Sequence, residues 1–199
     1  MTTPAERVDR LDGPASRAEF AALAAACATR LAPVFESFAR TGKGRYADWL
    51  AQLGACISSP DPARTRELQQ QIKAAPEAFV DDSNRPDYYA MRVLGVLFYA
   101  VQVLAADDME AAVLRCSRAA VSLLRGFDYV LDTPPGSAGA LAELELRAER
   151  EWVGQRNASP AAWSAAQAME EARTSSLYMR LQEVTGEIAL AHDWELTEW

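Results

Sequence analysis

Five residues that could bind a ligand recur on one face of a predicted helix in the middle of the chain. They are Tyr88, Arg92, Gly95, Tyr99 and Gln102, spaced at i, i+4, i+7, i+11 and i+14. An arginine, two phenols and an amide around the notch left by a glycine can hold a small anion or a partner's side chain. The pattern also fits a partly exposed stripe in which Arg92 pairs with a carboxylate of a neighbouring helix. We take Tyr88, Arg92, Tyr99 and Gln102 as candidate ligand-binding residues.

An acidic cluster directly before this helix is the second candidate. Asp81 and Asp82 are followed by Ser83, Asn84 and Asp87. Carboxylates in such a run could bind Mg²⁺, although no second metal-binding motif accompanies them. Ser and Asn also shape turns, and carboxylates favour the N-terminus of a helix. We predict that Asp81, Asp82 and Asp87 contact a protein partner.

Two glutamates one helical turn apart, Glu145 and Glu149, could serve as oxygen ligands for a metal ion. Arg147 and Arg150 lie between and beside them, and such a mixture of charges is typical of a solvated helix face. We therefore predict no metal site.

Three arginines, Arg115, Arg118 and Arg125, follow one another on the polar side of the preceding predicted helix. They could bind an anion. They could equally pair with glutamates of the next helix, and this second interpretation is the one we expect. The glutamates are Glu143, Glu145 and Glu149.

The sequence contains few of the residues on which enzymes depend. It has no Gly-rich phosphate loop, no G-x-S-x-G and no H-E-x-x-H motif. The single histidine, His192, excludes most His-based triads and His-ligated metal sites, and we expect it at the surface. Cys27, Cys56 and Cys116 are far apart and predicted to be core residues. These features favour a protein that is not an enzyme and that needs no cofactor.

Composition predicts an all-α fold and disfavours nucleic acid as a partner. Alanine supplies 39 of the 199 residues, whereas Gly and Pro supply 10 each. The net charge of −8 is opposite to that of proteins that bind a phosphate backbone, and it suits a basic partner. Arginine outnumbers lysine by 18 to 2, which together with the alanine excess suggests a GC-rich bacterial genome.

Hydrophobic periodicity predicts a single-domain bundle of about seven helices, with a kinked first helix and a buried central helix. The helices are expected at residues 16–41, 45–57, 63–75, 86–106, from 107 or 108 to 131, 137–156 and 159–192. Ser16 and Glu19 form a capping-box pattern at the start of the first, Pro33 should kink or split it, and Thr41–Gly42 should end it. Ser137 should cap the sixth, Ser159 should cap the seventh, and residues 174–176 could interrupt the seventh. The domain is expected to span residues 15–192, after a flexible lead-in (1–14) and before an acidic, Trp-containing tail (193–199).

We expect a cytoplasmic protein with no membrane segment. The N-terminus carries Arg7 and Arg10 without an apolar core, so it does not resemble a signal peptide. The longest apolar run, residues 93–106, is broken by Gln102 and is shorter than the roughly 20 residues that a bilayer requires.

Three parts of the chain resemble the YjaG-like bacterial proteins of unknown function. They are residues 27–38 with Thr41–Gly42, the turn at residues 81–83 with the helix after it, and the helix from Glu110 with the later pattern of Glu145, Glu149, Trp152 and Gln155. The resemblance covers roughly residues 20–156. It implies an all-helical cytoplasmic protein without an assigned activity, and it transfers no catalytic residue.

Two hypotheses for the function follow. The first is a non-catalytic protein that binds a partner protein and shields a basic one, for example as immunity to a nuclease toxin. The second is a small-molecule or anion binder, conceivably an enzyme, that uses the Tyr88–Gln102 face. The alanine-rich seventh helix could also pair with itself in a homodimer.

Overall fold

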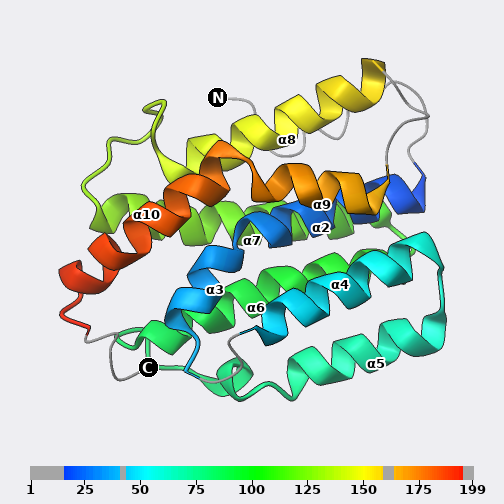
Figure 1. The fold of residues 1–199 in the computed structure, drawn as a ribbon, viewed down its shortest axis with the longest axis horizontal. Coiled ribbons are helices and arrows are strands. Elements are labelled where there is room, and N and C mark those ends of the chain that lie inside the picture. The colour runs from blue at the N-terminus through cyan, green and yellow to red at the C-terminus, as the bar shows by residue number, and fades with distance from the viewer. Residues whose placement is uncertain (1–15, 41–43, 159–163, 195–199) are drawn as a thin grey trace.

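The computed structural model describes residues 16–40, 44–158 and 164–194. This part of the chain consists of nine α-helices and one 3₁₀ helix, η1, without a strand (Figure 1). The helices are α2 (Arg17–Arg30), α3 (Ala32–Phe38), α4 (Arg45–Ser58), α5 (Pro62–Lys73), η1 (Pro76–Phe79), α6 (Pro86–Val103), α7 (Met109–Val130), α8 (Leu141–Ala158), α9 (Ala165–Arg173) and α10 (Ser176–Ala191). The all-α prediction is confirmed, and the expected number of about seven helices is corrected to nine.

The first additional helix arises from a break between α2 and α3. Leu31 caps both helices, and Pro33 lies in the first turn of α3. Proline has no N–H to continue the α-helical hydrogen bonds, so the chain bends here by about 40°. The predicted kink is confirmed. The expected end of this helix at Thr41–Gly42 lies outside the described residues.

The second additional helix arises from a break between α9 and α10. The Ser175 hydroxyl donates to the Ala172 carbonyl at 2.7 Å and accepts from the Tyr178 N–H at 3.3 Å. One side chain thus ends α9 and caps α10. The expected cap at Ser159 lies outside the described residues, and α9 is capped by Ser164 instead.

Helix α2 is the most deeply buried of the helices that the structure describes. Every residue from Phe20 to Arg30 is buried, and most of them are alanines, so neighbouring helices approach closely. Helices α9, α6, α7 and α4 pack around it, and Figure 1 shows it running alongside α9 through the middle of the molecule. The expected central helix, α6, buries 10 of its 18 residues and leaves a partly exposed stripe.

The N-terminus of α2 is held by the predicted capping box. The Ser16 hydroxyl accepts from the Glu19 N–H, and the Glu19 carboxylate accepts from the Ser16 N–H at 2.6 Å. Glu19 also accepts from Nε of Arg156 at 2.9 Å, which ties the start of α2 to the end of α8. A local cap is therefore also a tertiary contact.

The start of α8 is capped from another helix. The carboxylate of Asp128 in α7 accepts the N–H groups of Leu141 and Ala142 at 2.7 and 3.0 Å. The expected cap, Ser137, lies four residues before α8 begins, so that prediction is wrong. The reason is tertiary: α7 brings a buried carboxylate to amides that would otherwise lack partners.

The described part of the C-terminal tail packs on the bundle. Trp194 contacts the rings of Phe38 and Tyr89, and its indole N–H donates to the Asn84 carbonyl at 2.7 Å. Residues 1–15 and 195–199, which include the whole expected lead-in and most of the expected tail, lie outside the described residues.

Within the described residues, no single helix has the length and apolar character to cross a bilayer. The bent pair α2 and α3 would reach that length and composition only together.

Replacing Asp128 by alanine should lower the free energy of unfolding by about 1–3 kcal/mol, because two helix-terminal N–H groups lose their acceptor. Chemical denaturation measures the change. Ser137→Ala is the matched control and should stay within about 0.5 kcal/mol of the unmodified protein. Equal losses in both variants would contradict the cross-helix cap.

Glu19→Gln should destabilise the protein at pH 7 by about 1 kcal/mol. Burial raises the pKa of the Glu19 carboxyl, but its hydrogen bonds with Ser16 and Arg156 outweigh burial and bring the pKa below the usual 4.5. The folded state therefore favours the charged carboxylate. The stabilisation that this charge provides is fully present above the pKa of the unfolded chain, and it is lost as the pH falls through the lower pKa of the folded protein. The difference in unfolding midpoint between the two proteins should therefore shrink below about pH 4.5. A difference that is constant with pH would refute this role of the charge.

Candidate functional site

The predicted ligand-binding face lies on α6, next to α7. Arg92 donates from Nη2 to the Ser122 hydroxyl at 3.3 Å, and its guanidinium carbon lies 5.9 Å from the centre of the Tyr88 ring. Tyr88, Arg92, Tyr99 and Gln102 are all partly exposed. In the described part of the chain Arg92 has no carboxylate partner, contrary to the alternative interpretation of this stripe.

Only two of the four predicted ligand-binding residues contact each other. Tyr88 and Arg92 touch, whereas Tyr99 lies two helical turns further along α6 and contacts Phe98. The three pockets described below are lined by other residues. The Tyr88–Gln102 face is therefore an open strip beside α7.

The predicted acidic cluster is divided by burial. Asp81 and Asp82 are exposed, and Asp82 shapes the turn by accepting from the Asn84 N–H at 3.0 Å. Asp87, by contrast, is only 3% exposed and pairs with Arg85 through both carboxylate oxygens. We therefore remove Asp87 from the predicted partner surface, because its charge is already compensated.

The segment that carries Asp81 and Asp82, residues 77–85, is called the acidic loop here. It begins within η1, which packs on α6, and it holds Phe79 with 75% of its surface exposed. Neither aspartate forms an ion pair with another described residue. Sequence reasoning missed Phe79, because η1 has only four residues and shows no periodicity from which exposure could be read.

A buried ion pair, Arg30 with Glu145, lies between α2 and α8. Nε and Nη2 of Arg30 donate to the two Glu145 oxygens at 2.6 Å each, and the side chains are 4% and 0% exposed. Glu149 is also buried. The expectation that Glu145 and Glu149 lie on a solvated face is thus wrong. The signal that could have revealed the pair is Arg30, a charge that closely follows the apolar run of residues 20–28.

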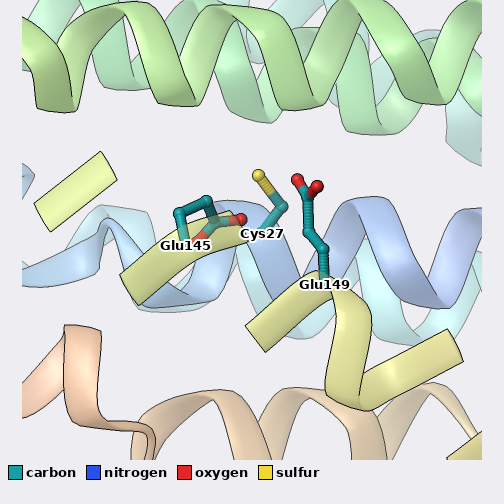
Figure 2. A group of neighbouring side chains, drawn as sticks. All are labelled: Cys27, Glu145 and Glu149. Atoms are coloured by element: carbon teal, nitrogen blue, oxygen red, sulfur yellow. The ribbon is translucent and has the colours of Figure 1, made fainter. Parts of the chain in front are cut away.

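Cys27 lies beside this pair and completes a cluster of possible metal ligands. The nearest ligand atoms of Cys27, Glu145 and Glu149 all lie within 4.8 Å of one another, and Figure 2 shows the Cys27 thiol between the two glutamates. A thiolate and two carboxylates could surround a divalent cation.

The electrostatics of the cluster favour an ion pair over a metal centre. Arg30 occupies both oxygens of Glu145 and supplies the positive charge that a metal ion would bring. The neighbouring Cys116 thiol, together with burial and the Glu145 charge, raises the pKa of Cys27 well above its usual 9.0. A metal ion would have to displace the proton of this thiol, and the raised pKa opposes that step.

The arginine stripe of α7 does not pair as expected. Arg115, Arg118 and Arg125 are exposed, and none forms an ion pair with another described residue. Glu145, one of their expected partners, is instead held by Arg30 in the core. The tertiary arrangement thus leaves the three arginines on the surface.

The largest pocket described lies at the end of the bundle where α7, α8 and α10 meet. We call it the end pocket. It measures about 740 Å³, and charged or titratable side chains line it together with the turn at residues 133–136. These side chains are Arg125, Asp128, Tyr129, Asp132, Glu143 and His192.

Two smaller pockets lie elsewhere. One of about 270 Å³ is lined by Arg17, Ile57 and Leu104, among others. The other, about 240 Å³, lies over Arg30 and Trp152 and thus reaches the buried ion pair. Neither includes a residue predicted to bind a ligand or a partner.

His192 is not the plain surface residue that we expected. Its ring stacks on Trp194 with centroids 4.3 Å apart and planes inclined by 8°. Its Nε2 is buried and has no hydrogen-bond partner among the described residues. His192 thus connects the end pocket to the aromatic cluster of Phe38, Tyr89 and Trp194.

Comparison with protein-family models, with curated proteins and with solved structures gave no match. The resemblance to the YjaG-like proteins therefore stays a prediction.

Glu145→Ala should destabilise the protein by about 3–5 kcal/mol, because it leaves the Arg30 charge buried without its partner. The double variant Arg30→Met with Glu145→Leu should recover part of this loss, since it removes both members of the pair, although the nearby buried Glu149 loses the attraction of Arg30. Glu183→Ala removes an exposed pair with Arg180 and should cost no more than about 1 kcal/mol. Denaturant unfolding distinguishes the three variants, and a double variant as unstable as Glu145→Ala would refute the ion-pair interpretation.

Proposed function

We propose that this protein is a non-catalytic, cytoplasmic bacterial protein that binds a basic protein partner through its acidic loop. The observation that carries the proposal is the placement of Phe79, 75% exposed, beside Asp81 and Asp82, which are exposed and form no ion pair with the described residues. Shielding of a basic enzyme, as in immunity to a nuclease toxin, is the form of this function that we favour.

An exposed aromatic side chain next to exposed carboxylates is suited to contact a basic surface. Covering the Phe79 side chain contributes about 1.5–3 kcal/mol, and aromatic residues are enriched at the centres of interfaces. The two carboxylates attract a basic partner from a distance, and the net charge of −8 adds to this attraction. Phe79 would thus provide most of the binding affinity, and Asp81 and Asp82 would increase the rate of association.

The acidic loop is held in place at both of its ends. The N–H of Ala78 donates to the Ala75 carbonyl at 3.0 Å, and η1 packs on α6. At the other end, the Trp194 indole donates to the Asn84 carbonyl. A loop that is already ordered loses less entropy on binding, which supports its use as a recognition surface.

Binding of a small anion at Tyr88 and Arg92 is the second candidate function. It is favoured by the absence of a carboxylate partner for Arg92 in the described part of the chain. A thermal-shift titration with inorganic phosphate tests it: the unmodified protein should be stabilised and Arg92→Ala should not. Equal responses of the two proteins would exclude Arg92 as an anion site.

Membership of the YjaG-like proteins and a homodimer through the C-terminal helices remain further proposals. Met179 of α10 is 50% exposed and could lie in such a dimer contact.

The partner proposal is tested by affinity capture from a lysate of the source organism, at low and at high salt, with mass spectrometry of the bound proteins. We expect one basic protein, captured at low salt and weakened by high salt. Phe79→Ser and Asp81→Lys should each reduce its capture by about tenfold, equivalent to roughly 1.4 kcal/mol.

Asp107→Lys is the matched control for Asp81→Lys. Both aspartates are exposed, and they flank opposite ends of α6, which is about 27 Å long. The control variant should capture the partner as the unmodified protein does. Equal capture by all variants would remove the acidic loop from the binding surface.

A further inference from the structure

We infer that the end pocket binds an arginine side chain of a basic peptide segment. This inference rests on the proposed function, because it names the second contact and the chemical class of the partner's binding segment. No residue of the end pocket belongs to the acidic loop or to the Tyr88–Gln102 face.

The pocket carries an excess of negative charge. Asp128, Asp132 and Glu143 contribute three carboxylates against the single guanidinium of Arg125, so its formal charge is −2 with His192 neutral. Asp132 and Glu143 form no ion pair with another described residue. Asp128 is different, because each of its carboxylate oxygens accepts an N–H group from α8. A cationic group would therefore be attracted into this pocket.

Size and shape favour a guanidinium over a metal ion. At about 740 Å³ the pocket is far larger than a dehydrated ion requires, and it suits a long side chain with part of its flanking peptide. Arginine offers five N–H donors in a planar fork, which can reach carboxylates that are separated from one another. A lysine ammonium would satisfy fewer of them at once.

An exposed aromatic side chain lines the pocket. Tyr129 is 88% exposed, and the lining residues Pro134 and Pro135 add further apolar surface. A tyrosine ring next to carboxylates is suited to stack on a guanidinium. Apolar side chains around a charged centre are also the arrangement in which a bound peptide excludes water.

The wall of the pocket is a constrained turn. Asp132 and Gly136 both adopt left-handed backbone conformations, with φ of 50° and 79°, and Pro134 and Pro135 lie between them. The Asp128 carboxylate fixes the start of α8 on the far side of this turn. The carboxylates are therefore positioned before any ligand arrives.

The end pocket and the acidic loop lie at the same end of the bundle. Trp194, two residues after His192, donates to Asn84, two residues after Asp82. In Figure 1 the end of α10, the turn before α8 and the start of α6 all lie at the left of the molecule. One basic partner could therefore contact both surfaces at once.

The probe is a fluorescein-labelled hexa-arginine peptide, whose binding to the full chain is followed by anisotropy at low salt. The double variant Asp132→Asn with Glu143→Gln removes two charges from the pocket. Asparagine tolerates the left-handed conformation of position 132, so the turn should be retained, which thermal unfolding verifies. We expect the double variant to weaken binding at least about tenfold, equivalent to roughly 1.4 kcal/mol.

Three comparisons make the result specific. Tyr129→Ser should weaken binding about threefold if the ring stacks on the guanidinium. Hexalysine should bind the unmodified protein less tightly than hexa-arginine. Asp107→Asn, which removes a charge remote from the pocket, should leave the affinity unchanged within about twofold.

The outcomes separate the two proposals. Weaker binding in the pocket variants but not in Asp81→Asn supports the end pocket and counts against the acidic loop. Weaker binding in Asp81→Asn alone overturns the end pocket and leaves the acidic loop standing. The inference is also overturned if the unmodified protein does not bind the peptide, or if Asp107→Asn weakens binding as much as the pocket variants do.

Discussion

The ion pair between Arg30 and Glu145 determines how α8 lies against the centre of the molecule. Two charges inside a low-dielectric core are tolerated only when each satisfies the other, so neither side chain can shift without leaving a buried charge. Helix α8 is also fixed at its start, where Asp128 accepts two of its N–H groups, and at its end, where Arg156 donates to Glu19. These three polar contacts specify the register of a helix that carries many charged residues.

The placement of α8 has a direct consequence for the surface. Because Asp128 holds the first turn of α8, the connection from α7 must turn sharply, and this turn forms the wall of the end pocket.

The polar groups of the core are largely paired with one another. Several surface carboxylates, among them Asp81, Asp82 and Asp132, have no ion-pair partner among the described residues. Exposed aromatics, Phe79 and Tyr129, lie near them. Within the described residues, the features that suit recognition thus gather on the surface at one end of the bundle, whereas the ion pair that stabilises the core is buried.

The candidate site could be predicted from the sequence only where local chemistry decides it. Asp81 and Asp82 could be placed in an exposed turn, because a run of Asp, Ser and Asn favours one. Asp87 could not be distinguished from them, since its burial depends on how the first turn of α6 packs against the rest of the bundle. The same holds for Glu145, whose neighbours Arg147 and Arg150 are exposed as expected while it points into the core. Residues that are neighbours on one helix can lie in different environments. The sequence alone does not say which side of the helix packs against another helix.

By itself, the sequence determined the all-α class, the capping box at Ser16, the kink at Pro33 and the positions of most helices. These features depend on interactions within a few residues, which helix propensity, capping and proline chemistry describe. The tertiary structure alone decided which charges are buried, that Asp128 caps α8, and that the acidic loop and the end pocket share one end of the bundle. Most of these join residues far apart in the chain, for example 115 positions for Arg30 and Glu145 and 137 for Glu19 and Arg156, and such contacts form only when the helices pack.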